Sequence, residues 1–131
     1  MLRTFFAQTI DVSAHCDLPC GVYDPAQARI EAESIKAIIA KVADNDDPDF
    51  RTRAILIKEQ RSELVKHHLW VLWTDYFKPE HLEAHPQLHE KFWTATKLAG
   101  DAKRSVDPAQ GQQLLDAIAE IDKIFWDTKQ A

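Results

Sequence analysis

Three Asp-Pro pairs constrain the fold of this 131-residue chain more than any other feature of its sequence. They are Asp24-Pro25, Asp47-Pro48 and Asp107-Pro108. An aspartate carboxylate can accept the free N–H groups of a helix's first turn, and a proline at the first helical position has no N–H to leave unpaired. Each pair therefore predicts a helix start, and Lys78-Pro79-Glu80 predicts a fourth, weaker one. The predicted helices span about 25–43, 48–76, 80–103 and 108–128.

Apolar residues recur at steps of three and four along these helices, which is typical of helices that bury one face. The first carries Ala28, Ile35, Ile38 and Val42, the second Phe50, Ala54, Ile57, Leu64 and Val71, and the fourth Leu114, Ile118, Ile121 and Phe125. Helices joined by short links pack as antiparallel neighbours. The predicted fold class is therefore all-α, an antiparallel up-down four-helix bundle over residues 24–131.

Composition narrows the class of partner. The formal charge of -5 argues against nucleic acid, because binding to phosphates needs a basic surface. No apolar run approaches the roughly 20 residues of a membrane-spanning helix. Two cysteines alone do not make a disulfide framework. We therefore expect a soluble cytoplasmic domain with neither a nucleic-acid nor a membrane partner.

Two features depart from a plain bundle. Glu31 falls on the apolar stripe of the first helix and Arg61 on that of the second, where a charge is costly unless it is paired or useful. Two interpretations stay open: each reaches solvent along its own stem, or the two serve a site. The run 69–73, LWVLW, is apolar on every side and predicts that other subunits cover it.

The segment 15–23, HCDLPCGVY, concentrates both cysteines of the chain beside a histidine. A disulfide between Cys16 and Cys20 would stay open in a reducing compartment. A closed zinc site would need a second ligand cluster, and a redox dithiol usually has the spacing C-x-x-C. Metal binding is thus one of several interpretations that the spacing leaves open.

Cleavage of the chain between Ala14 and His15 would change the chemistry of this segment, because His15 would gain a free primary amine. That amine, the amide nitrogen and thiolate of Cys16, and the thiolate of Cys20 would form a near-planar N2S2 set. Planar N and S donors favour Ni(II) or Cu(II) over zinc, which prefers a tetrahedron. The His15 imidazole could bind as an axial fifth donor. With such a cut, residues 1–14 would be a leader removed on maturation, and residues 15–23 a metal-binding hook.

The pattern H-C-x-x-P-C-G-V-Y resembles the nickel-binding hook of the nickel-containing superoxide dismutases. Further similar stretches lie at 58–61 (KEQR), 66–68 (KHH), 73–79 and 121–126. The resemblance implies an oxidoreductase that disproportionates superoxide to dioxygen and hydrogen peroxide by Ni(II)/Ni(III) cycling. It also implies one nickel per chain, a homohexamer of four-helix bundles, and a protease that removes the leader.

Carried over residue by residue, the resemblance implies distinct roles for ten side chains. The nickel ligands are His15, Cys16 and Cys20; the residues that shape the pocket and supply protons are Asp17, Pro19 and Tyr23. Glu31 and Arg61 hold the axial imidazole, with Arg61 drawn from the same or a neighbouring subunit. Tyr76 and Lys78 match positions near the site, where they would support it or steer superoxide.

Two other functions compete with this one. His81, His85 and His89 recur at steps of four, which would place three imidazoles on one helix face, as in a metal store. Ferritin-like sites, however, need Glu-x-x-His pairs on two helices, and Pro86 interrupts this helix. We therefore expect these to be surface or interface histidines. The second alternative is a helical interaction module in which the two cysteines are an accidental dithiol.

Overall fold

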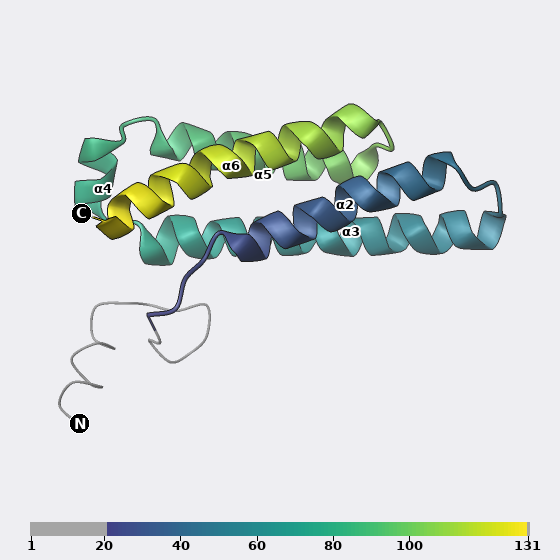
Figure 1. Cartoon of the computed structure of the whole chain (residues 1–131), viewed down its shortest axis with the longest axis horizontal. Coiled ribbons are helices and arrows are strands. Elements are labelled where there is room, and N and C mark those ends of the chain that lie inside the picture. The colour runs from purple at the N-terminus through teal and green to yellow at the C-terminus, as the bar shows by residue number, and fades with distance from the viewer. Residues whose placement is uncertain (1–20, 131) are drawn as a thin grey trace, which may run out of the picture.

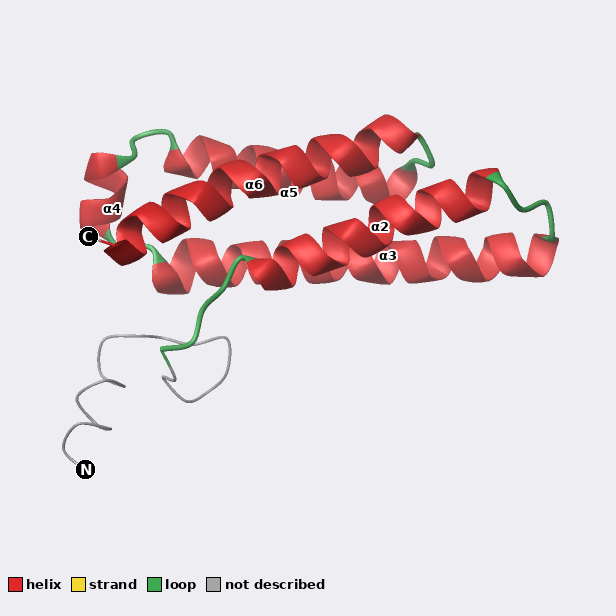
Figure 2. Cartoon of the chain, viewed as in Figure 1, coloured by secondary structure: helices red, strands yellow, loops and turns green. Residues whose placement is uncertain are grey.

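The computed structural model describes residues 21–130 of the chain; residues 1–20 and 131 lie outside the described part. The described elements are all helical (Figure 2). They are α2 (Ala26–Ala43), α3 (Pro48–Val71), the π-helical turn η1 (Leu72–Tyr76), α4 (Pro79–Ala84), α5 (Leu88–Arg104) and α6 (Pro108–Gln130).

The four long helices form an antiparallel bundle, which confirms the predicted fold class. Helix α2 packs against α3 and α6, and α5 packs against the same two helices, so the four close into a ring. Short connections make successive helices run in opposite directions (Figure 1). The short helix α4 lies at one end of the bundle, in the connection from η1 to α5.

The Asp-Pro pairs begin three of these helices as predicted. The Asp24 carboxylate accepts a hydrogen bond from the amide of Ala26 at 2.8 Å. The carboxylates of Asp47 and Asp107 likewise accept from backbone amides in the first turns of α3 and α6, at 3.1 and 2.9 Å. Each carboxylate thus satisfies an N–H that has no partner inside its helix.

The third predicted helix, 80–103, is wrong as a single element. Helix α4 ends at Ala84 and α5 begins at Leu88, with Pro86 between them. A proline disfavours helical backbone in the residue before it. His85 accordingly has φ -129° and ψ 75°, outside the helical region. The second predicted helix also changes character near its end, because its last turn is the wider π-helical η1.

The apolar stripes of α2 and α6 are confirmed in large part, but the stripe of α3 is confirmed only at Ala54 and is wrong at Ile57 and Leu64. Ala28, Ile35 and Val42 of α2 are buried, as are all four predicted residues of α6, whereas Ile38 is only half-buried. On α3 the predicted Ile57 and Leu64 are 38% and 37% exposed. The buried residues of α3 are Ala54, Lys58, Ser62, Val65 and Leu69. The buried face of α3 is therefore displaced from its most apolar stripe and includes two polar residues.

Lys58 explains how a polar face of α3 can be buried. Its side chain is 1% exposed, and its ammonium donates to the carbonyls of Ala102 at 2.6 Å and Lys103 at 2.7 Å. These carbonyls belong to the last turn of α5, where a helix has no internal donors left. Burial lowers the pKa of Lys58 from its ordinary value. The hydroxyl of Ser62 is satisfied as well, because it donates to the carbonyl of Lys58 at 2.9 Å.

Replacing Lys58 by methionine should destabilise the bundle while keeping its packing volume. The variant leaves two carbonyls near the end of α5 without a buried donor, so we expect the free energy of unfolding to fall by about 2–4 kcal/mol. Urea denaturation at one fixed chain concentration measures this change. Lys123→Met, at an exposed position of α6, is the matched control and should stay within about 0.5 kcal/mol. Equal stability of the two variants would contradict the capping role.

The apolar run 69–73 is only partly covered by its own chain. Leu69 and Leu72 are buried, whereas Trp70 is exposed. Other large apolar side chains are exposed elsewhere on the bundle, among them Ile30, Leu56, Trp93 and Trp126. None of the helices within residues 21–130 combines the length and apolar content needed to cross a membrane.

Candidate metal centre

Five of the predicted site residues, His15, Cys16, Asp17, Pro19 and Cys20, lie outside the described residues. The structure instead gives the junction between the hook and the bundle. Gly21, directly after Cys20, has a φ of 71°, a backbone conformation that L side chains rarely adopt. The glycine of the hook pattern therefore supplies this conformation two residues before the hook ends at Tyr23.

Tyr23 anchors this junction to the bundle. Only 8% of Tyr23 is exposed, and its ring lies 5.5 Å from the ring of Tyr76, measured between centroids, at an angle of 54°. Helix α2 begins just after it, at Ala26. Two residues that the sequence placed near the site, 53 positions apart in the chain, are thus in contact.

Tyr76 is held on several sides. Its ring contacts Phe125 of α6 at 4.5 Å and Phe77 at 4.9 Å, and it stacks on His81 of α4 at 5.8 Å with only 19° between the planes. Its hydroxyl lies 2.8 Å from the Oγ1 of Thr128, near the end of α6. Tyr76 lies in the wider turn η1, and its ring therefore packs where η1, α4 and α6 meet.

Glu31 and Arg61 form an ion pair between α2 and α3. The Arg61 Nη1 donates to both carboxylate oxygens of Glu31, at 3.2 and 3.0 Å. The side chain of Glu31 is 15% exposed and that of Arg61 is 41% exposed. The two charges are therefore paired: Glu31 is mostly covered, whereas Arg61 lies at the edge of α3 and also reaches solvent.

The pair forms within one chain, so no neighbouring subunit is needed to bring Arg61 to Glu31. Within residues 21–130 Arg61 binds this carboxylate through Nη1 alone. A guanidinium has five N–H donors in a rigid fork. Arg61 therefore keeps donors for a further acceptor while Glu31 holds its orientation.

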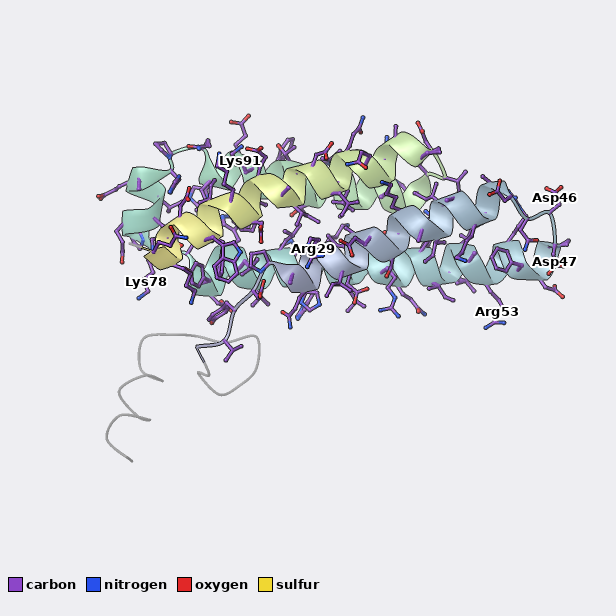
Figure 3. The ribbon with its side chains drawn as sticks, in the orientation of Figure 1. Arg29, Asp46, Asp47, Arg53, Lys78 and Lys91 are labelled. Carbon is purple, nitrogen blue, oxygen red and sulfur yellow. The ribbon has the colours of Figure 1, made fainter. Side chains whose placement is uncertain are left out.

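Lys78 lies at the end of the bundle occupied by α4, where its side chain is exposed (Figure 3). Its backbone N–H donates to the Nδ1 of His81 at 3.1 Å. A second cation, not predicted from the sequence, lies here: the Nζ of Lys129 is 5.1 Å from the ring centroid of Tyr76. Thr128 was missed too. The signal was the helical spacing from the predicted core residue Phe125, which places both on adjoining faces of the last turn of α6.

The three histidines do not share a helix face. His81 is on α4, His85 lies between the helices, and His89 is on α5. The Nδ1 of His89 accepts a hydrogen bond from the indole of Trp73 at 2.7 Å. Among residues 21–130 no group of three or more His, Cys, Asp or Glu side chains could hold a metal ion. The break at Pro86 thus removes the arrangement on which the metal-store alternative depended.

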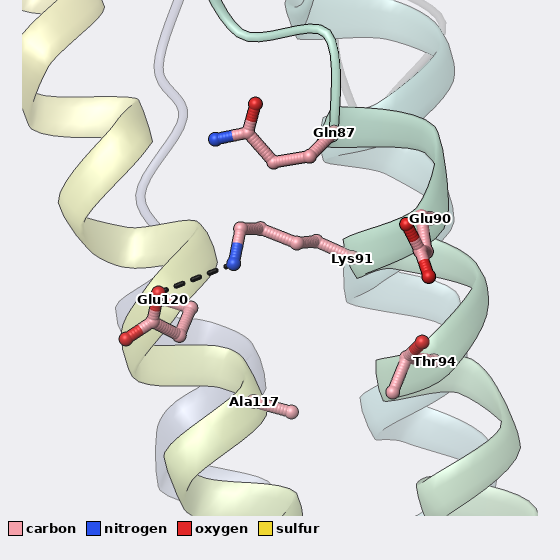
Figure 4. Close-up of a pocket in the computed structure, with 6 residues that line it drawn as sticks. All are labelled: Gln87, Glu90, Lys91, Thr94, Ala117 and Glu120. Atoms are coloured by element: carbon pink, nitrogen blue, oxygen red, sulfur yellow. Dashed lines mark hydrogen bonds and ion pairs between the residues drawn. The ribbon is translucent and has the colours of Figure 1, made fainter.

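A cavity of about 360 Å³ lies elsewhere, between α5 and α6 (Figure 4). The ammonium of Lys91 and the carboxylate of Glu120 form an ion pair across it at 3.2 Å. It is lined by Gln87, Glu90, Lys91, Thr94, Ala117 and Glu120. None of these is a predicted site residue.

Comparison with known proteins identifies the family. The family model described as nickel-containing superoxide dismutase matches residues 10–129. The chain is 64% identical to "Superoxide dismutase [Ni]" of Streptomyces coelicolor and 65% identical to that of Streptomyces seoulensis, in both cases over the full length of both chains. It is also similar to a native crystal structure of a nickel superoxide dismutase, with 66% identity and a TM-score of 0.88 over 89% of this chain and 100% of that one. The chain therefore belongs to the nickel-containing superoxide dismutase family.

Proposed function

We propose that this protein disproportionates superoxide at one nickel ion per chain, held by a processed N-terminus that begins at His15. The observation that carries the proposal is the full-length match to two nickel superoxide dismutases in a chain with the complete hook pattern. Two superoxide anions and two protons give one dioxygen and one hydrogen peroxide. When bound, nickel supplies the one-electron exchange between Ni(II) and Ni(III) that this reaction requires.

The proposed ligands are His15, Cys16 and Cys20. His15 provides its α-amine and its imidazole, Cys16 its amide nitrogen and thiolate, and Cys20 its thiolate. Thiolate and imidazole are donors that suit nickel, and an anionic set of this kind stabilises the more positive ion. The surroundings fit this group: the segment that bears the donors is anchored by Tyr23, and α2 and α3 carry a partly buried ion pair.

The proposed maturation step removes residues 1–14 by a processing protease. An internal His15 has an amide in place of the primary amine, so the unprocessed chain lacks one of the four planar donors. The two curated relatives match this chain over its full length, so the match includes the segment 1–14.

Glu31 and Arg61 are the proposed partners of the His15 imidazole. A histidine that ligates a metal usually hydrogen-bonds through its other ring nitrogen, and this bond fixes the ring's orientation. The ion pair supports the role because Glu31 immobilises Arg61, which still has N–H donors to offer. This proposal gives a reason for charges at positions where an ordinary bundle would have apolar residues.

Asp17, Pro19 and Tyr23 are the proposed pocket residues. Peroxide formation needs protons, and we assign Tyr23 to ordering the water that delivers them and to limiting access. Its contact with Tyr76 supports a fixed position for the phenol ring. The formal charge of -5 repels a superoxide anion, so local cations must steer it. Lys78 is the predicted steering residue, and Lys129, beside Tyr76, adds a second positive charge.

A homohexamer is the proposed assembly. The exposed apolar side chains of the single chain support self-association, because large apolar residues such as Trp70, Trp93 and Leu56 otherwise remain in water. We place the enzyme in the cytoplasm, where reducing conditions would keep the Cys16 and Cys20 thiols available to the metal.

The proposal is tested by metal selectivity. A chain trimmed to His15 is loaded in parallel with nickel, zinc, iron or no metal, and superoxide decay is followed by stopped flow. We expect about one nickel per chain and dismutase activity in the nickel sample alone. Equal activity in the zinc or metal-free sample would overturn the proposal. The variant His15→Gln separates the two roles of His15, the planar α-amine and the axial imidazole. After nickel loading, this variant should still bind the metal through the planar donors but lose most turnover.

A further inference from the structure

Thr128 stands out because its hydroxyl makes two hydrogen bonds at once. Its Oγ1 donates to the backbone carbonyl of Phe125 at 2.7 Å and lies 2.8 Å from the hydroxyl of Tyr76. A threonine hydroxyl has a single hydrogen and two acceptor lone pairs. Because that hydrogen goes to the carbonyl, Thr128 can only accept from Tyr76.

The direction of the Tyr76 hydroxyl is thereby fixed. Its one hydrogen points to Thr128, away from any other partner, so the phenolic oxygen can serve other groups only as an acceptor. The ring itself is immobilised by Phe125 on one side and His81 on another. Tyr23, the last residue of the hook, is another neighbour, with its ring centroid 5.5 Å away.

We propose that Thr128 is a positioning residue for the reaction. By accepting the Tyr76 hydrogen it fixes the hydroxyl and ring of Tyr76, which pack on Tyr23 at the end of the hook, and leaves the phenolic oxygen of Tyr76 only as a hydrogen-bond acceptor for other groups. This inference rests on the proposed function for its effect on turnover. The orientation of Tyr76 itself is independent of nickel, since the residues that determine it all lie within 21–130.

The orientation is tested by Raman spectroscopy of the full-length, metal-free chain. The Fermi doublet of a tyrosine ring differs between a phenol that donates a hydrogen bond and one that only accepts. The chain has two tyrosines, so Tyr23→Phe leaves Tyr76 as the only source of the signal. In that background we expect a donor-type doublet that is lost in Thr128→Val and kept in Thr128→Ser. A doublet unchanged by Thr128→Val would overturn the inference.

The effect on turnover is tested in the nickel-loaded trimmed chain with both tyrosines present. We expect Thr128→Val to lower the turnover number about fivefold, the effect of one neutral hydrogen bond, and Thr128→Ser to stay within about twofold of the parent. Thr52→Val, at an exposed position in the first turns of α3, is the matched control for the same substitution and should leave turnover unchanged. Equal turnover of Thr128→Val and Thr52→Val would overturn the positioning role.

The two measurements separate the inference from the proposed function. If the parent chain showed no dismutase activity with nickel, the proposed function would fail, yet the Raman doublet would still decide the orientation of Tyr76. Circular dichroism of each variant checks that the helices form, and the rescue by serine distinguishes a lost hydroxyl from a general loosening of the end of α6.

Discussion

Replacement of Cys20 by serine in a chain trimmed to His15 should reduce dismutase activity to background. A serine hydroxyl remains protonated near neutral pH and is a poor ligand for nickel, which favours the softer thiolate in this set. If the binding free energy of about 10–16 kcal/mol seen for structural zinc sites with four ligands is shared equally among the donors, the loss of one bond weakens nickel affinity by about 70- to 900-fold. Nickel titration followed by the sulfur-to-nickel absorption measures the affinity, and stopped flow the activity.

The bundle should not change in this variant, because Cys20 precedes α2 and the described helices hold the fold together. Unaltered circular dichroism would show that the loss is local to the hook. Cys16→Ser should behave in the same way, since these are the chain's two thiols. Retention of nickel and of half the parent activity in either variant would contradict the assignment of the thiolates as ligands.

Glu31→Gln should lower turnover by about 10- to 100-fold, the usual cost of altering a group that orients a metal ligand. Glutamine has the shape of glutamate but lacks its charge, so Arg61 loses the ion pair that holds it at 3.0 Å. Nickel content should stay near one per chain, because the planar donors are untouched. Turnover and metal content measured on the same sample separate these two effects.

Glu33→Gln provides a close control on the same helix. Glu33 pairs with Arg29 at 2.8 Å, but both side chains are about half exposed, and exposed pairs of this kind contribute little. Its turnover should match that of the parent. In the double variant Glu31→Gln/Arg61→Gln, the loss should be no larger than in the single variants if the two act as a unit. Equal turnover of Glu31→Gln and Glu33→Gln would remove the pair from the mechanism.

The helix starts of the bundle were predicted well, because the sequence signals for them act on the adjacent backbone. The Asp-Pro pairs predicted three helix starts because capping involves only neighbouring atoms. The face of α3 could not be predicted in this way. Lys58 is buried because α5 ends beside it, in a contact between residues 44 positions apart that no periodicity reveals. Pro86 was visible in the sequence, and its effect on the helix was underestimated.

In the candidate site, too, some residues were predicted from the sequence, whereas contacts between distant segments were not. Charges on apolar stripes led to Glu31 and Arg61, and the structure brings these two together. The hook pattern led to Tyr23, and its partner Tyr76 was carried over from the family resemblance. Thr128 and Lys129 contact a ring on another segment, and their helical spacing from Phe125 does not reveal that contact. The assignment of His15, Cys16 and Cys20 remains a prediction.

The central claim is that a metal site forms only after the chain is cut before His15. The most direct measurement is the intact mass of active protein purified from its native cells, with nickel determined on the same sample. The predicted result is a chain that begins at His15 and carries about one nickel. Active protein that retains residues 1–14, or that keeps its activity after the nickel is removed, would contradict the claim.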